Sequence, residues 1–460
     1  MTQPIDLSSS RRIHIIGVGG AGMGAIAHVL HRMGHQVSGS DLTASAAFER
    51  LVAEGVDARL GHDGANVAEA DLVVRSTAIP DRNVEVRAVV ESGGVVHRRA
   101  DVLGAICRLR RTAAIAGTHG KTTTSSMLAV ISLAAESDPS FIIGGDITEL
   151  GTGATWNPGK WFIVEADESD GTFLELGHTL GLVTNVEPDH LEHYGGEPQL
   201  RAAFHEFIEA ADVGVVCLDD NGAATLARSS GVVTYGLHAD STYRIVDLSR
   251  GGFHTSFRLH RAGLDLGEVR VPMPGVHNAR NAAGAAAAAI EMGLPFSAVV
   301  SGLATFRGVG RRFQPRGNAR GVTFIDDYAH LPTEVAAALD AAADTGHDRV
   351  VAIFQPHRYS RTAALWRDFA GSFDRADLLV VTDVYASGEP PREGVSGELI
   401  VEAARSSSEP PPIVYLPDRS TLATEVASIL RPGDLCLTLG AGDSVELPDE
   451  ILALLGGADG

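Results

Sequence analysis

The segment that most constrains this chain is 117–123, which reads Gly-Thr-His-Gly-Lys-Thr-Thr. It follows the apolar run 113–116 and precedes a helix-like stretch at 124–130. A strand, a glycine turn and a helix start form a phosphate site, because backbone N–H groups at a helix N-terminus attract anions. In this interpretation Lys121 reaches the β- and γ-phosphates of a nucleotide, and the Thr122 hydroxyl can hold Mg²⁺. An ordinary strand-to-helix turn is the alternative.

Lysine usage supports the phosphate-site interpretation. The chain contains only two lysines, Lys121 and Lys160, and arginine supplies nearly every other basic side chain. Because Arg and Lys are not interchangeable at such sites, a lysine retained inside the loop suggests that a compact ammonium group is needed there.

The size and charge of the chain restrict its class and its partners. With 460 residues, of which 44% are hydrophobic, it can form two or three globular domains, each with its own core. The net charge of −21 repels nucleic-acid backbones and anionic membranes, so we expect neither as a partner. The cysteines Cys107, Cys217 and Cys436 are far apart in sequence, which predicts buried thiols in a reducing compartment.

One N-terminal segment could be mistaken for a secretory signal. Arg11 and Arg12 precede an apolar stretch at 13–30, but that stretch contains five glycines and two histidines. It therefore fits a strand, a turn and a helix better. No later segment has about 18 uninterrupted apolar residues, so we predict a cytoplasmic protein.

Strand-like and helix-like segments alternate along the whole chain, which predicts an α/β fold with mostly parallel sheets covered on both faces. We expect a Rossmann-like domain at 1–107, a central P-loop-type ATPase domain at 108–316, and a second Rossmann-like domain at 317–460. The small polar residues at 316–318 predict a hinge between the last two.

A second glycine motif, Gly17-x-Gly19-x-x-Gly22, follows the first predicted strand and opens a helix. Asp41 ends the next strand and completes the dinucleotide-binding pattern. NAD or FAD, another nucleotide diphosphate, and simple packing are all compatible with this motif alone. Together with the phosphate loop, it favours an enzyme that joins an ATP-activated, nucleotide-linked substrate to something else.

Acidic and histidine side chains follow two predicted strands of the central domain. Glu165 ends one strand and opens the sequence Glu-Ala-Asp-Glu-Ser-Asp, and carboxylates in that position can bind Mg²⁺. His190 follows another strand, next to two acids, and is a candidate metal or phosphate ligand. A solvated acidic loop and a structural histidine are the alternatives.

Further polar segments suit ligands. Asn278 and Asn281 share a helix face, where their amides could form hydrogen bonds with an adenine edge. The alternative is that one asparagine caps the helix N-terminus and the other is a buried polar residue with a structural role. Arg358 and Arg361 are three residues apart and could clamp a carboxylate. His, Arg and acidic residues at 326–332 and 355–361 follow strands, where α/β sheets build ligand sites.

In their order and spacing, these segments resemble the Mur ligases, the ATP-dependent amide-forming enzymes of peptidoglycan assembly. The resemblance covers essentially the whole chain and all three expected domains. It rests on the segments at 17–23, 117–123, 165–170, 185–190, 277–281, 310–313, 326–330 and 354–361.

The resemblance implies that the three domains hold a UDP-sugar, ATP and an amino acid, in that order, and that the reaction passes through an acyl phosphate. Lys121, Glu165 and His190 would be catalytic, with Thr122, Glu165 and His190 as Mg²⁺ ligands. ATP would be bound by Gly117, Thr118, His119, Gly120, Lys121, Thr122, Thr123, Asn278, Asn281, Arg311 and Asp327. The substrates would be bound by Gly17, Gly19, Gly20, Gly22, Met23, Asp41, Ser76, Thr77, His330, His357, Arg358 and Arg361, of which the two arginines take the amino-acid carboxylate.

Several Mur ligases carry a carbamylated lysine shortly after the segment that matches 189–194, but this chain has no lysine beyond Lys160. The resemblance therefore favours the alanine-adding branch, with UDP-N-acetylmuramate and L-alanine as substrates, and we expect a monomer or weak homodimer. The alternatives are a recycling ligase that adds a tripeptide to the same UDP-sugar, an NAD-dependent oxidoreductase fused to an ATPase, and a non-catalytic nucleotide-binding scaffold.

Overall fold

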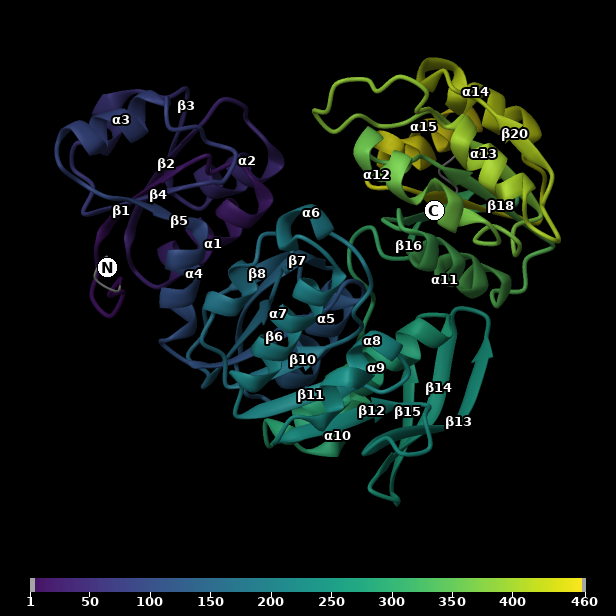
Figure 1. Ribbon diagram of the computed structural model, residues 1–460, viewed down its shortest axis with the longest axis horizontal. Coiled ribbons are helices and arrows are strands. Elements are labelled where there is room, and N and C mark those ends of the chain that lie inside the picture. Colours follow the sequence, from purple (N-terminus) through teal and green to yellow (C-terminus); the bar gives the residue numbers. More distant parts are fainter. Residues whose placement is uncertain (1–4, 457–460) are drawn as a thin grey trace. The chain divides into compact units, whose positions relative to one another are not determined.

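The computed structural model describes residues 5–456, which divide into two compact units. The first unit holds the chain up to residue 246, together with 258–269 and 280–306. The second holds 247–257, 270–279 and the chain from residue 307 onward. Figure 1 labels the helices and strands of both units.

The first sheet is parallel and has the strand order β3-β2-β1-β4-β5, as expected for a Rossmann-like fold. The order reverses between β1 and β4, so a ligand site is expected at the carboxyl end of β1. The strands are β1 (Arg12–Ile16), β2 (Gln36–Asp41), β3 (Asp57–Leu60), β4 (Leu72–Arg75) and β5 (Val96–Arg98). The helices are α1 (Ala21–Arg32), α2 (Ala46–Ala53), α3 (Val84–Glu91) and α4 (Arg99–Cys107).

The second sheet has ten strands in the order β15-β14-β13-β12-β11-β10-β6-β9-β7-β8, with parallel pairing around β6 and an antiparallel β7–β8 pair at one edge. Its strands are β6 (Arg111–Ala116), β7 (Ser140–Ile147), β8 (Thr152–Thr155), β9 (Trp161–Glu165), β10 (Leu180–Val183), β11 (Val213–Cys217), β12 (Val232–Gly236), β13 (Tyr243–Gly251), β14 (His254–Arg261) and β15 (Leu264–Val271). Its helices are α5 (Lys121–Ala134), α6 (Leu191–Tyr194), α7 (Glu197–Glu209), α8 (Asn221–Ala224), α9 (Val276–Glu291) and α10 (Phe296–Thr305).

The third sheet has the order β16-β17-β21-β18-β19-β20 and is parallel except for the edge strand β16. Its strands are β16 (Gln314–Ala319), β17 (Val322–Asp327), β18 (Arg349–Phe354), β19 (Leu378–Val381), β20 (Ile413–Tyr415) and β21 (Asp434–Leu439). Its helices are α11 (Pro332–Ala343), α12 (Tyr359–Leu365), α13 (Glu398–Arg405), α14 (Arg419–Ile429) and α15 (Leu447–Leu454).

The structure corrects the expected hinge at 316–318. These residues lie inside β16, which pairs with β17 across an irregularity between Pro315 and Gly317. Strand hydrogen bonds hold the backbone that was expected to bend. A domain boundary after residue 316 would also cut this strand, so a boundary before Gln314 keeps the sheet whole. The other expected domain bounds stay predictions.

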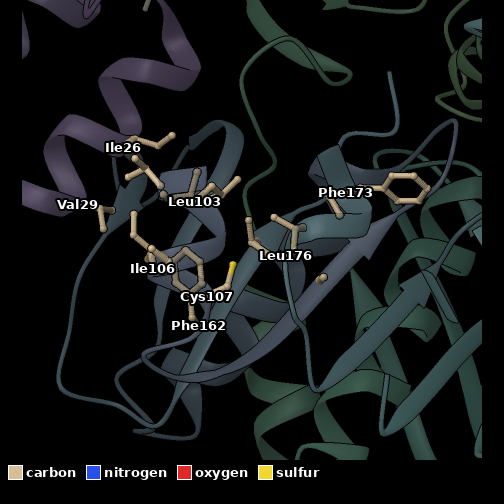
Figure 2. Close-up of a cluster of buried hydrophobic side chains, with 14 of the residues drawn as sticks. Ile26, Val29, Leu103, Ile106, Cys107, Phe162, Phe173 and Leu176 are labelled. Carbon is tan, nitrogen blue, oxygen red and sulfur yellow. The ribbon is translucent and has the colours of Figure 1, made fainter. Parts of the chain in front are cut away.

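A continuous core connects the first two sheets within the first unit. Helices α1 and α4 contribute Ile26, Val29, Leu103 and Ile106 to one buried cluster that also includes Phe162 of β9 (Figure 2). This packing fixes the start of α4 beside the start of α1: a Cβ on Gly22 would lie 3.4 Å from Cζ of Arg99.

The cysteines are buried and form no disulfide, as the sequence predicted. Burial raises the pKa of the Cys217 thiol to about 11 and that of Cys107 to about 12, which leaves both thiols protonated and unreactive at neutral pH. Within the described residues, no helix combines the length and the apolar character needed to cross a membrane.

Candidate active site

The predicted phosphate loop joins β6 to α5 and has the backbone of an anion site. Gly117 and Gly120 have φ values of 129° and 79°, in the left-handed region that favours glycine. A side chain on Gly117 would collide with Thr184, and a Cβ on Gly120 would lie 2.6 Å from Oδ1 of Asn281. No side chain caps α5, so the N–H groups of its first turn remain available to a ligand.

Residues after β10 hold this loop in place. The main-chain N–H of His119 donates to Oδ1 of Asn185 at 2.7 Å, and Nδ2 of Asn185 donates to the main-chain oxygen of His119 at 3.0 Å. Nε2 of His119 also lies 3.1 Å from a carboxylate oxygen of Glu187. From the sequence, His190 was expected to be a metal or phosphate ligand, and the role of Asn185 and Glu187 in positioning the loop was missed.

Lys121 is charged and surrounded by carboxylates. Its Nζ donates to the main-chain oxygens of Gly117 and Thr118 at 2.5 and 3.2 Å, and to Oε1 of Glu168 at 3.0 Å. Burial alone would lower the Lys121 pKa, but the negative charges of Glu168, Asp167 and Glu165 raise it above its ordinary value. The sequence analysis did not single out Glu168 from its acidic neighbours.

Thr122 and Glu165 meet as expected for a shared cation site. The Thr122 hydroxyl donates to Oε1 of Glu165 at 3.1 Å, and the N–H of Gly144 donates to the other carboxylate oxygen at 2.8 Å. Among residues 5–456, no group of three or more His, Cys, Asp or Glu side chains is arranged to hold a metal ion.

His190 begins α6 with a left-handed φ of 52°, an uncommon conformation for a histidine that often marks functional sites. Nε2 of His190 lies 3.3 Å from a carboxylate oxygen of Asp189. In the described part of the chain, no contact joins His190 to Thr122 or Glu165. Farther along α6, the Tyr194 hydroxyl donates to the main-chain oxygen of Glu168 and so ties this helix to the acidic loop.

The two asparagines of α9 have different surroundings. Asn281 is 8% exposed, accepts a hydrogen bond from Oγ1 of Thr124 at 3.3 Å and lies directly against Gly120. Asn278 is 2% exposed and donates to the main-chain oxygen of Pro274 at 2.7 Å. Only Asn281 is therefore placed at the phosphate loop by a described contact.

The glycine motif after β1 also forms a tight loop. Gly17 has a φ of 83°, and its N–H donates to the main-chain oxygen of Ser40 at 2.8 Å. A Cβ on Gly17 would lie 3.1 Å from that of Ser76, so Ser76 flanks the loop, and Thr77 beside it is exposed. Gly20 starts α1 without a side-chain cap.

Two of the residues that were expected to bind the substrate make contacts within the protein. Asp41 accepts hydrogen bonds from the N–H of Gly19 at 2.9 Å and of Leu42 at 2.7 Å, so it shapes the loop. Met23 is 3% exposed and packs in the core, so its expected contact with the substrate would come from its main chain and stays a prediction. The sequence pattern could not separate a loop methionine from the first buried position of α1.

A cavity of about 570 Å³ connects this glycine motif to the acidic end of β9. Its walls come from α1, α2, α4, β7, β8 and the residues after β9. Gly22 and Arg99 line it together with Glu165 and Asp167. Within the first unit, one space thus reaches from an open helix N-terminus to the carboxylates beside the phosphate loop.

In the second unit, Arg311 and Asp327 organise the start of the third sheet. Arg311 has a left-handed φ of 62°, and its guanidinium donates to the main-chain oxygen of Gly440 at 2.8 Å. Asp327 accepts hydrogen bonds from the N–H groups of Phe313 and Ala329 at 2.7 and 2.8 Å. Burial raises the pKa of Asp327 to about 6, although the Arg312 charge opposes the shift.

The four residues expected to hold an amino acid gather in the second unit. The His330 and His357 rings are 6.0 Å apart, and Arg361 lies 3.3 Å from Nδ1 of His357. Burial, followed by the proximity of His330, Arg361 and Arg358, lowers the pKa of His357 to about 4. Burial also lowers the pKa of His330 below its ordinary value. The histidines are therefore neutral at neutral pH, and the cluster keeps the charge of its arginines.

Three family models match the chain in succession. The Mur ligase family catalytic domain matches residues 12–111, the Mur ligase middle domain 115–289, and the Mur ligase glutamate ligase domain 311–442. The chain belongs to the Mur ligase family. The order of the three matches agrees with the three sheets, and the phosphate loop lies within the middle-domain match.

Individual Mur ligases match over nearly the whole chain. UDP-N-acetylmuramate–L-alanine ligase of Geobacter sp. strain M21 is 43% identical, covering 96% of this chain and 97% of its own length. The Geobacter sulfurreducens enzyme of the same name is 44% identical over 96% and 97%. The solved structure of UDP-N-acetylmuramate–alanine ligase from Thermotoga maritima has a TM-score of 0.80 and 27% identity, covering 97% of this chain and 99% of that one.

Proposed function

We propose that this Mur ligase joins L-alanine to the carboxylate of UDP-N-acetylmuramate at the expense of ATP, a step of peptidoglycan synthesis. The observation that carries the proposal is the ammonium of Lys121, held at the open N-terminus of α5 beside Thr122 and Glu165. Relatives named for this activity share 40 to 44% identity with nearly all of the chain.

The proposed reaction has two steps. An oxygen of the muramoyl carboxylate attacks the γ-phosphorus of ATP and ADP leaves, which forms an acyl phosphate. The alanine amine then attacks the acyl carbon, phosphate leaves with the electrons of the C–O bond, and the nitrogen loses a proton to give the amide. Lys121 stabilises the charge of the transferring phosphoryl group, and Glu168 orients the ammonium before the nucleotide binds.

The residues present fit Mg²⁺ at this site. Mg²⁺ takes oxygen ligands, often one or two from the protein and the rest from substrate phosphates and water. The adjacent oxygens of Thr122 and Glu165, 3.1 Å apart, suit that role. When bound, the ion would neutralise phosphate charge. The roles of His190 as a further ligand, and of Asn278, Asn281, Arg311 and Asp327 toward ATP, stay predictions.

We expect the cluster in the second unit to select the amino acid. The Arg358 and Arg361 guanidinium groups can form charge-assisted hydrogen bonds with a carboxylate. The neutral rings of His330 and His357 add polar contacts without repelling the ammonium of alanine.

The test is release of phosphate from ATP in the presence of UDP-N-acetylmuramate, with L-alanine, with a tripeptide, or with no amino acid. We expect release with L-alanine alone. Release only with the tripeptide would make the chain a recycling ligase, and release that is independent of UDP-N-acetylmuramate would contradict both activities. Repeating the assay with excess chelator and then restoring Mg²⁺ tests the cation.

A further inference from the structure

The cavity of the first unit contains a basic side chain, Arg99, that the proposed reaction does not explain. Arg99 is the first residue of α4, and its guanidinium makes no hydrogen bond or ion pair with any residue in 5–456. Its Nε is buried. Because a buried donor without a partner costs free energy, this arrangement points to a missing ligand.

The other basic side chains of the cavity wall are already accommodated. Nδ1 of His28 lies 2.5 Å from a carboxylate oxygen of Glu54, and Arg50 lies 2.6 Å from one of Asp146. Arg32 also lines the cavity but is exposed to water. Arg99 is therefore the half-buried cation of this wall that, in the described structure, makes no hydrogen bond or ion pair, although its charge is near enough to Asp167 to help keep the pKa of that carboxyl low.

The position of Arg99 indicates which part of a ligand it meets. Its Cζ, Nε and Nη2 lie 3.4, 3.5 and 3.6 Å from where a Cβ on Gly22 would be. Gly22 is in the first turn of α1, whose N–H groups have no intrahelical partners and no side-chain cap. The open N-terminus of α1 and the guanidinium thus face the same end of the cavity.

We propose that Arg99 binds the diphosphate of the nucleotide-linked substrate, beside the glycine motif at the N-terminus of α1. This inference rests on the proposed function, which supplies a UDP-sugar. The diphosphate is favoured over the sugar carboxylate because the proposed reaction needs that carboxylate at the phosphate loop, beside Lys121 and Glu165, whereas Arg99 lies against the first turn of α1. A planar guanidinium also matches two phosphate oxygens better than an ammonium does.

The experiment measures, by calorimetry, the affinities of the full-length chain for UDP-N-acetylmuramate, UDP, uridine and ATP. Arg99→Gln should weaken both UDP-N-acetylmuramate and UDP by about 10- to 100-fold, which is the loss of one charge-assisted contact. Uridine and ATP should bind as before. Arg99→Lys should fall between, and Arg87→Gln, which removes an exposed arginine of α3, should change nothing.

Two results would overturn the inference. One is unchanged affinity of Arg99→Gln for UDP, and the other is a loss confined to UDP-N-acetylmuramate, which would place Arg99 on the sugar carboxylate. Retained ATP affinity shows that a variant is folded, and if Arg99→Gln does not fold, Arg99→Lys carries the test with the same ligands. Wild-type protein that binds UDP but releases no alanine-dependent phosphate would refute the proposed function without refuting this inference.

Discussion

Two sites at the carboxyl ends of parallel strands differ in how their basic side chains are compensated by carboxylates. In the first unit, the Lys121 ammonium lies 2.9 Å from a Glu168 oxygen, with Asp167 and Glu165 near enough to raise its pKa. In the second unit, Arg358 and Arg361 stand beside two histidines whose pKa values are lowered, chiefly by burial. The Lys121 charge is balanced by buried carboxylates of the protein, whereas the second site holds two arginines, with Glu389 near enough to Arg358 for the pKa of that carboxyl to be lowered.

This difference predicts whether a substitution at each site lowers the stability of the fold or the affinity for a ligand. Removing Glu168 from the first site takes away the carboxylate that is hydrogen-bonded to the buried Lys121 ammonium, so the first site should lose stability. At the second site Arg358 is exposed and its interaction with Glu389 is screened by water, so a change there should weaken binding of a carboxylate and leave folding intact. The following predictions test this contrast, from the largest expected effect to the smallest.

Lys121→Ala should lower turnover by about 1000-fold or more, because it removes a preorganised charge from the transferring phosphoryl group. Affinity for UDP-N-acetylmuramate should survive, since that ligand is expected at the glycine loop of the first sheet. Lys160→Ala is the matched control, because Lys160 is the other lysine of the chain and is exposed. Steady-state phosphate release and calorimetry measure the two effects, and near-normal turnover of Lys121→Ala would exclude the proposed role.

Glu168→Gln should destabilise the protein by about 3 kcal/mol, because it leaves the buried Lys121 ammonium without its closest carboxylate. Thermal or urea unfolding of the full chain measures the loss. The double variant Lys121→Met with Glu168→Gln should recover part of it, since it no longer buries an unpaired charge. A single variant as stable as wild type would show that the site is not balanced in the way described.

Arg358→Ala should raise the KM for L-alanine by about 10- to 150-fold and leave the KM for ATP nearly unchanged, as expected for one lost charge-assisted contact. Its melting temperature should change little, because Arg358 is exposed. Arg405→Ala, an exposed arginine on α13, is the control for loss of charge. Equal effects on both substrates would assign Arg358 to the nucleotide.

Protonation of His357 should lower the free energy of unfolding by about 1 kcal/mol when the pH falls from 7 to 5. This value is smaller than the pKa shift alone would give, because the ring is partly exposed and water screens its interactions. Its pKa is about 4 when folded, below the ordinary 6.5, so the folded chain binds fewer protons. The contribution is present above about pH 6.5 and is lost as the pH falls toward 4.

Asp327 acts with the opposite sign, because its pKa is raised to about 6 and its contribution is lost as the pH rises through that value. The comparison of wild type with His357→Asn, by thermal unfolding at pH 5 and 7, isolates the histidine. Parallel pH profiles for the two proteins would show that His357 titrates normally.

Strands that form a continuous apolar run can be recognised from the sequence, and strands without such a run cannot. β1, β9 and β18 are apolar runs with clear boundaries. β3 is largely exposed, and β16 contains Pro315 and Gly317, so neither shows an apolar pattern. Edge strands are stabilised by a neighbouring strand, which single-sequence periodicity does not report.

The sequence alone determined the family resemblance, the α/β class and the local chemistry of 117–123, because a glycine turn and a helix start depend on adjacent residues. Tertiary structure decided that Glu168 is the carboxylate on Lys121, that Asn281 lies behind Gly120, and that Met23 is buried. It also placed Arg99 beside Gly22. Each of these depends on how distant elements pack. Thr124 and Asn281, for example, are 157 residues apart in sequence and meet only because α5 packs in the same unit as the part of α9 that begins at residue 280.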